Sequence, residues 1–273
     1  MKQARLTDPR PIIGTSSVIR DLKVECEAIA PSRSTILMTG ERGVGKEVFA
    51  HYIHGLSPRR GEPLITVNCA GVSESLLESE LFGQVRGSCP DTHRDQWGIL
   101  ASADHGTVLL DEIGEMGMRM QTLLLRFLET GEIPQVGADI PAQPLDVRLI
   151  AGTTRNLWTA TKQKAFREDL YYRLHVVRLT VPPLRERPED IWPLLRHFLT
   201  HFSALEGRLV PALTAEVAAY LEGYLWPGNV RELKNVAELL VVGYAGRSVT
   251  YQDLPADIKP AAARQSWRAI LTH

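Results

Sequence analysis

A glycine-rich stretch early in the chain has the residue types and spacing that suit a polyphosphate: Gly40-Glu41-Arg42-Gly43-Val44-Gly45-Lys46-Glu47. Its glycines let several backbone N–H groups converge on phosphate oxygens, because no Cβ atom obstructs the approach. Lys46 adds a positive charge for the outer phosphates, and a helix that begins there adds the positive end of its dipole. The pattern predicts a phosphate-binding loop, although Glu47 replaces the usual Ser or Thr; the alternative is a chance glycine-lysine turn.

Two acids at the end of an apolar run can supply the other half of a phosphate-transfer site. The run 106–110 reads as a buried strand, and Asp111 and Glu112 follow it directly. The carboxyl ends of parallel strands face the ligand crevice of an α/β sheet, so these carboxylates are expected beside the phosphates. One acid would hold magnesium, directly or through water, and the other would orient or deprotonate the attacking water. The alternative is an acidic strand end that is only solvated.

The elements that must position these residues alternate between strands and helices. Apolar β-prone runs predict strands at 34–38, 64–69, 106–112, 147–154 and 176–181. Helical periodicity predicts helices at 17–30, 46–56, 73–82 and 118–129. Ser75 and Glu78 have the spacing of a capping box in the third of these helices. The alternation predicts an α/β fold with a parallel sheet.

A proline-rich segment at 182–188 marks a junction, beyond which the periodicity is helical at 191–205, 214–224 and 230–242. The segment 83–98 has no apolar periodicity and reads as a long loop or a loop-tipped insertion. We therefore expect a linker at 1–11, an α/β nucleotide-binding subdomain at 12–183, a small all-helical lid at 184–260 and a tail or linker at 261–273.

Composition limits the class of protein. Of 273 residues, 44% are hydrophobic and 23% are charged, as in an ordinary soluble globular protein, and the formal net charge is -1. This charge gives no basic field for nucleic acid or anionic membranes, and no apolar run is long enough to span a bilayer. Three scattered cysteines argue against a disulfide frame or structural zinc and favour a cytoplasmic location.

Together these stretches resemble the AAA+ central domain of bacterial enhancer-binding proteins, the activators of sigma-54 RNA polymerase, over about 12–260. The loop at 40–47 is similar to the family's G-E-x-G-T-G-K-E, so Glu47 is expected there, while Val44 replaces a Thr. The resemblance implies that Asp111 is the magnesium-side acid of Walker B and Glu112 the water-activating one. It also implies that Asn68 is the switch residue that restrains the catalytic acid until the γ-phosphate is sensed.

The resemblance assigns further residues to nucleotide sensing. Thr154 stands at the sensor I position, where the family usually has Asn, so its shorter side chain is expected to alter sensing. Arg167 and Arg173 resemble arginine fingers that reach the nucleotide of a neighbouring subunit and stabilise charge on the transferred phosphoryl group. The alternative for such arginines is an exposed salt-bridged face. Arg231 resembles the sensor II arginine, on a lid helix that touches the phosphates.

One segment departs from the family pattern. Family members carry G-A-F-T-G-A where this chain reads Gly87-Ser88-Cys89-Pro90-Asp91-Thr92, so only the first glycine remains. The family's Phe and Thr engage the sigma factor, and an exposed aromatic anchor on a loop serves only partner contact. The loss predicts that the chain does not activate sigma-54 polymerase through the usual loop.

The resulting hypothesis is an ATP- and Mg2+-dependent domain of a transcription regulator that forms a homo-oligomeric, hexameric ring and hydrolyses ATP. RNA polymerase or a sigma factor is its expected partner, DNA contact is expected through a domain outside this sequence, and no membrane contact is expected. Two alternatives remain: a fully competent sigma-54 remodelling ATPase with a variant loop, and a nucleotide-binding ring that has lost hydrolysis.

Overall fold

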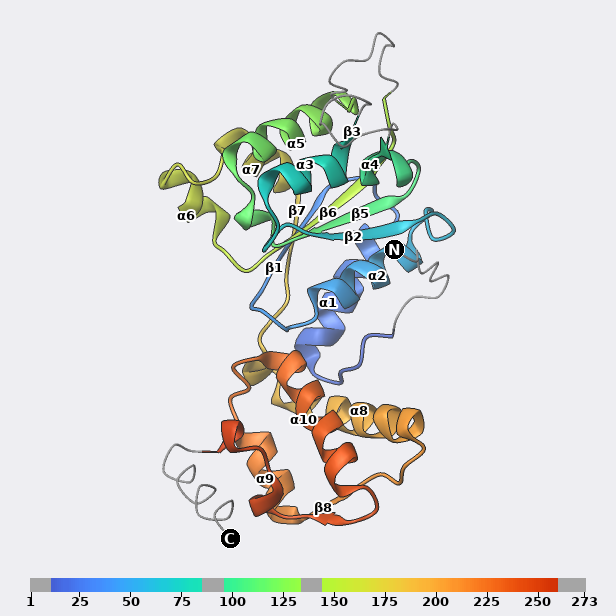
Figure 1. The fold of residues 1–273 in the computed structure, drawn as a ribbon, viewed down its shortest axis with the longest axis vertical. Coiled ribbons are helices and arrows are strands. Elements are labelled where there is room, and N and C mark those ends of the chain that lie inside the picture. Colours follow the sequence, from blue (N-terminus) through green and yellow to red (C-terminus); the bar gives the residue numbers. More distant parts are fainter. Residues whose placement is uncertain (1–10, 85–95, 134–143, 260–273) are drawn as a thin grey trace. The chain divides into compact units, whose positions relative to one another are not determined.

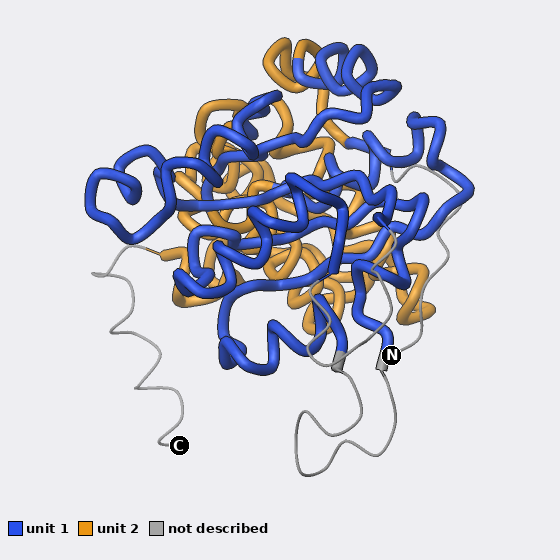
Figure 2. The backbone as a smooth tube through the Cα atoms, turned by 90° about the horizontal axis from the view of Figure 1, so that it is seen from above, with its two compact units in different colours: residues 1–12, 22–41, 45–181 blue, residues 13–21, 42–44, 182–273 orange. Residues whose placement is uncertain are grey.

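A computed structural model describes residues 11–84, 96–133 and 144–259. The chain divides into two compact units, each of which is described by itself (Figure 2). The first unit comprises residues 1–12, 22–41 and 45–181, and the second comprises 13–21, 42–44 and 182–273. Residues 42–44, the middle of the glycine-rich loop, therefore belong to the second unit.

The first unit is built on a five-stranded parallel sheet with the strand order β2-β5-β6-β1-β7. Its strands are β1 (Ile36–Thr39), β2 (Leu64–Asn68), β5 (Thr107–Asp111), β6 (Arg148–Thr153) and β7 (Val177–Thr180). Each coincides with one of the expected apolar runs to within two residues at either end. The predicted parallel α/β architecture is confirmed.

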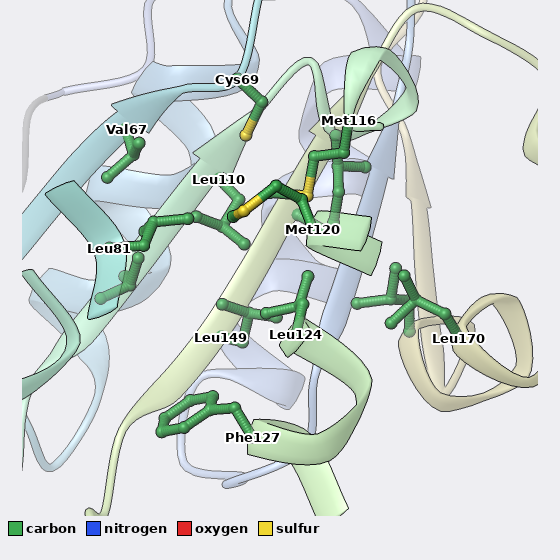
Figure 3. Packing of buried hydrophobic residues seen from close by; sticks show 14 of the residues in the cluster. Val67, Cys69, Leu81, Leu110, Met116, Met120, Leu124, Phe127, Leu149 and Leu170 are labelled. Atoms are coloured by element: carbon green, nitrogen blue, oxygen red, sulfur yellow. The ribbon is translucent and has the colours of Figure 1, made fainter. Parts of the chain in front are cut away.

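Helices cover both faces of this sheet, with α2 on one side and α3 and α5 on the other (Figure 1). Period-2 alternation along the strands divides the core between the two faces. Leu110 and Leu149 pack with α3 and α5, while the intervening Leu109 and Ile150 are buried on the opposite face. Figure 3 shows Met120, Leu124 and Phe127 of α5 lying over the strands. Because Leu124 is fully buried, its truncation to Ala would cost about 2–5 kcal/mol.

Four helices of this unit begin and end close to the expected residues, and three short ones, at 99–102, 157–162 and 168–174, were not expected. Helix α2 spans the predicted 46–56, and α3 begins one residue after the Ser73 hydroxyl, which accepts the N–H of Leu76. The N-cap is therefore Ser73 rather than Ser75, and the capping-box prediction is wrong. The helices are α1 (Ser17–Ile29, shared with the second unit), α2 (Lys46–Leu56), α3 (Glu74–Phe82), α4 (Ile99–Ser102), α5 (Met118–Thr130), α6 (Leu157–Lys162) and α7 (Glu168–Leu174).

The predicted insertion is flanked by a short antiparallel pair, β3 (Gly83–Gln84) and β4 (Gln96–Trp97). The six residues 87–92 that replace the G-A-F-T-G-A sequence lie outside the described residues.

The second unit packs three longer helices around Trp226, which is fully buried and donates its indole N–H to the carbonyl of Leu221 at 3.0 Å. A two-residue parallel strand pair joins these helices, so this unit is not entirely helical as predicted. Its elements are α8 (Ile191–Glu206), β8 (Ala212–Leu213), α9 (Ala215–Gly223), α10 (Asn229–Tyr244) and β9 (Ser248–Val249). In neither unit does a described helix combine the length and apolarity that a bilayer crossing requires.

Candidate active site

The glycine-rich loop joins β1 to α2 and adopts backbone conformations that glycine favours. Gly43 and Gly45 have φ values of 81° and 105°, in the left-handed region where a side chain is strained. Gly45 is also the N-cap of α2, so the N–H groups of the first helical turn open into the loop. Lys46 is the first residue of that helix and is only 7% exposed. Its ammonium donates hydrogen bonds to the carbonyls of Gly40 at 2.9 Å and Glu41 at 3.3 Å.

The two acids predicted for the site, Asp111 and Glu112, lie at the carboxyl end of β5, near this lysine. Lys46 Nζ is 4.0 Å from a carboxylate oxygen of Glu112, which is only 8% exposed. Asp111 accepts the backbone N–H of Glu112 at 3.1 Å. Burial is the main cause that raises the pKa of Asp111; the charge of Glu112 adds to the rise, and Lys46 opposes it. The structure thus brings the lysine and both acids together, as the sequence predicted.

The Glu112 carboxylate is fixed by the residue that directly follows the neighbouring strand, β6. Its Oε2 accepts the backbone N–H of Thr154 at 3.1 Å and the Thr154 hydroxyl at 2.9 Å. Asn68 is opposite Asp111 in the register of β2 and β5, but its carboxamide oxygen accepts the N–H of Ala70 at 2.9 Å. Among the described residues, the restraint on Glu112 that was expected from Asn68 is therefore provided by Thr154.

Backbone geometry adds a further constraint at Glu112. Its φ and ψ of 55° and 45° lie in the left-handed region, which costs a residue with a Cβ about 1–3 kcal/mol. This conformation turns the chain from β5 into the short 3-10 helix at Ile113–Glu115. The strain lies at the residue expected to activate water, where such outliers tend to occur.

Gly152, which the sequence did not single out, makes room for Asp111, the acid expected to hold magnesium. Gly152 lies within β6, and a Cβ atom there would be 2.7 Å from Oδ1 of Asp111. Contacts this short require a shift of the backbone or of the acid. The available signal was a glycine inside an apolar strand run, which often marks a close approach of another group.

The remaining loop residues differ in exposure. Val44 is buried, Glu41 is half-buried and Arg42 is exposed. Glu47 points outward, and its carboxylate is 3.5 Å from Nε2 of His51, one helical turn later.

In the second unit, the tip of the loop contacts the residues around the start of α10. The carbonyl of Gly43 accepts the backbone N–H of Arg231 at 3.2 Å, while the Arg231 side chain is exposed. A Cβ at Gly43 would be 2.4 Å from the carbonyl oxygen of Gly228, so this approach requires glycine. Two residues that the sequence analysis did not select also reach the loop, namely Asn229 and Arg187.

The two predicted finger arginines lie at the surface on α7 and just before it. Arg167 makes a paired contact with the carboxylate of Asp169, at 3.0 and 2.7 Å, which raises the pKa of the arginine. Arg173 donates to a single acceptor, the carbonyl of Leu128, at 2.8 Å from Nη2. Within the described part of the chain, both arginines are held by groups of their own subunit.

Comparison with known proteins decides the family. A family model described as the Sigma-54 interaction domain matches residues 12–180, and one described as the AAA+ ATPase lid domain matches residues 185–269. The chain belongs to the sigma-54 interaction domain family. This sigma-54 interaction domain is followed by an AAA+ lid, which confirms the AAA+ fold expected from the resemblance.

Relatives of this sigma-54 interaction domain include transcription regulators. It is 45% identical over 231 residues to the putative uric acid sigma-54-dependent transcriptional regulator UacR of Escherichia coli, covering 84% of this chain and 39% of UacR. It is 41% identical over 261 residues to the regulatory protein LuxO of Vibrio cholerae, covering 96% of this chain and 57% of LuxO. The chain therefore spans only part of these regulators.

A solved structure supports the same assignment. NtrX from Brucella abortus in complex with ATP superposes with a TM-score of 0.83 at 33% identity, covering 97% of this chain and 62% of NtrX. NtrX has also been solved in complex with ADP, with the same TM-score.

Proposed function

We propose that this domain binds ATP with Mg2+ and hydrolyses it as the motor of a cytoplasmic bacterial transcription regulator. The observation that carries the proposal is the cluster of Lys46, Asp111 and Glu112 at the glycine-rich loop, with Glu112 oriented by Thr154. The ATP and ADP complexes of NtrX support the choice of nucleotide.

The donor set at this position suits magnesium better than a metal that needs a full protein cage. Mg2+ binds through one or two carboxylates and substrate phosphates, and keeps several waters. Asp111 would supply such a carboxylate, whereas the described residues hold no cluster of three or more His, Cys, Asp or Glu side chains arranged for a metal. When bound, the ion would neutralise charge on the phosphate oxygens.

In the proposed reaction each residue has a separate role. The amides of the loop and Lys46 would bind the phosphates, and Glu112 would accept the proton of the attacking water. Thr154 would keep the Glu112 carboxylate in a fixed orientation, and Asn68 would take over that restraint in another nucleotide state. Arg231, on α10, would contact the phosphates through its exposed guanidinium.

We propose that hydrolysis requires a homo-oligomeric, hexameric ring. Arg167 and Arg173 would then insert into the site of the adjacent subunit, where their guanidinium groups stabilise charge on the transferred phosphoryl group. The exposure of Arg173, the partial exposure of Arg167 and the fact that Arg173 donates to a single backbone carbonyl, that of Leu128, support this role.

We also propose that the domain does not activate sigma-54 polymerase through the usual loop, because Gly87-Ser88-Cys89-Pro90-Asp91-Thr92 lacks the aromatic anchor. A fully competent sigma-54 remodelling ATPase is the second candidate, favoured by the family match over residues 12–180. Transcription in vitro from a sigma-54 promoter with ATP separates them, and robust activation would overturn the first. Binding of sigma-54 in the presence of a transition-state analogue is the matching physical test.

The nucleotide site is tested by Lys46→Ala. Loss of the ammonium removes the charge that compensates the outer phosphates, so ATP affinity should fall by at least about a hundredfold. Titration with a fluorescent ATP analogue measures this, and Lys234→Ala on α10 is the control. Unchanged affinity in Lys46→Ala would show that the loop has been misinterpreted.

Hydrolysis is tested by Glu112→Gln. The amide cannot accept a proton but keeps the size of the side chain, so turnover should fall by about a thousandfold while ATP binding persists. Steady-state ATPase assays across a range of protein concentration provide the measurement. If the unmodified protein binds ATP but shows no turnover that depends on Glu112, the non-hydrolysing ring becomes the better description.

A further inference from the structure

Three consecutive backbone carbonyls at the tip of the glycine-rich loop are held by donors of the second unit. The accepting residues are 42, 43 and 44, which belong to the same unit as their donors. The donors, in that order, are Asn229 Nδ2 at 3.1 Å, the Arg231 backbone N–H at 3.2 Å and Arg187 Nη2 at 2.9 Å.

The covalent geometry of the peptide converts these contacts into an orientation of N–H groups. In a planar trans peptide the C=O and the following N–H point in opposite directions. Each of these contacts therefore turns the N–H group that follows the held carbonyl, that of Gly43, Val44 or Gly45, away from the donor. The positive φ values of Gly43 and Gly45 fit a concave nest of amides, the arrangement that binds anions.

Burial of the charged Arg187 side chain costs free energy of folding. It is 2% exposed, and its Nε is one of the few buried side-chain atoms without a hydrogen-bond partner in the described structure. Burial lowers its pKa, which the charge of Asp190, 4.0 Å from Nη1, opposes. An apolar residue of similar size would often give a more stable core. Stability therefore does not explain why a guanidinium is buried here. Its hydrogen bond to the carbonyl of Val44 does.

Asn229 uses both ends of its carboxamide. It is fully buried, and its Oδ1 accepts the backbone N–H of Leu184 at 2.7 Å while Nδ2 reaches the carbonyl of Arg42. Its φ of 53° is one that Asn tolerates better than most residues. Leu184 and Arg187 belong to the proline-rich segment that the sequence identified only as a junction.

We propose that Arg187 and Asn229 are positioning residues of the phosphate site: they hold the loop carbonyls back so that the amides of residues 43–45 face the β-phosphate of a bound nucleotide. This inference rests on the proposed function. It assigns the junction segment a role in selecting nucleotides that carry a β-phosphate.

The test compares nucleotides that differ in that phosphate. Wild type, Arg187→Met, Arg187→Lys and Asn229→Ser are titrated with a fluorescent ADP analogue in the presence of Mg2+, and unlabelled ATP, ADP and AMP compete. Arg196→Met, which changes an exposed arginine of α8 in the same unit, is the matched control. The melting temperature of each nucleotide-free variant reports the structural effect separately.

Loss of one charge-assisted hydrogen bond should weaken ATP and ADP binding about tenfold in Arg187→Met, with AMP binding changed less than about twofold. Arg187→Lys and Asn229→Ser should show smaller losses of the same kind. A residue with only a structural role would lower the melting temperature and leave the ratio of ADP to AMP affinity unchanged.

An unchanged ratio in any folded variant of Arg187 overturns the inference, and if Arg187→Met does not fold, Arg187→Lys decides. This failure differs from failure of the proposed function. In the latter case the wild-type protein itself would not bind ATP or ADP.

Discussion

The carboxylate side and the arginine side of this site are built in different ways. Glu112 is 8% exposed, accepts two hydrogen bonds from Thr154 and lies 4.0 Å from Lys46. Arg173 is exposed and donates to one backbone carbonyl, that of Leu128. The acids are thus fixed before any ligand arrives, whereas the arginine is held by a contact that is easily exchanged.

The difference indicates which part of the chemistry one subunit can complete alone. Pre-oriented groups stabilise a transition state without reorganisation at the moment of reaction. The hydrogen bonds from the Arg173 guanidinium to the Leu128 carbonyl are exposed to solvent, where water competes for both partners, so a phosphate can replace this carbonyl at little cost. Arg167 is held more firmly, because it makes two hydrogen bonds to Asp169 and one to Thr122.

The largest expected effect comes from Arg173→Ala. If the guanidinium acts on a neighbouring subunit, turnover at high protein concentration should fall by about a thousandfold, while ATP affinity and the melting temperature change little. Arg173→Lys is the control that keeps the charge but loses the fork geometry, and it should recover only part of the rate.

Mixing two inactive variants tests whether Arg173 acts on a neighbouring subunit. Arg173→Ala and Glu112→Gln are each expected to be inactive, but mixed assemblies would contain interfaces with an intact Glu112 and an intact partner arginine. ATPase activity should therefore reappear when the two variants are combined. No recovery, with assembly demonstrated by sizing in the presence of ATP, would mean that Arg173 acts within its own subunit or not at all.

A smaller effect is expected for Thr154→Val, which removes one of the two hydrogen bonds on Glu112. The kcat should fall about tenfold with KM nearly unchanged, because the carboxylate loses orientation and not its contact with substrate. Thr200→Val, an exposed position on α8, is the control. If Thr154→Val instead raises KM alone, Thr154 contacts the nucleotide and its contact with Glu112 is incidental.

The smallest expected effect is on the pH dependence of folding stability, through the ionisation of Asp111. Burial raises the pKa of this acid in the folded chain, so the folded state holds the proton more tightly than the unfolded state. Its contribution to stability is therefore most favourable at low pH and declines as pH rises through the folded pKa. Asp111→Asn should raise the melting temperature by a few degrees near neutral pH, and the difference should vanish below about pH 4, near the unfolded pKa.

Thermal denaturation of both proteins between acidic and neutral pH provides the measurement. A difference that is equally large at both ends of that range would attribute the effect to packing and exclude ionisation of Asp111 as its cause.

Local patterns predicted the elements of this site well. The strand, loop and helix around Lys46 follow from an apolar run, three glycines and helical periodicity, all within about twenty residues, and α2 has the predicted bounds. The placement of Asp111 and Glu112 follows from the general rule that parallel strands present their carboxyl ends to a ligand.

The sequence could not predict contacts that depend on the final side-chain geometry. Thr154 and not Asn68 restrains Glu112. Asn68 ends β2 and Thr154 directly follows β6, the two strands that flank β5, so the choice depends on rotamers. The bonds from Arg187 and Asn229 to the loop span 143 and 187 residues. No local spacing rule covers such separations.

The left-handed backbone conformation of Glu112 matters for any attempt to raise the thermal stability of the domain. A glycine at that position would relieve the conformational penalty and abolish the proposed proton acceptor in the same step. A library selected only for heat resistance should therefore enrich inactive clones at residue 112. Heat tolerance and turnover would have to be screened together.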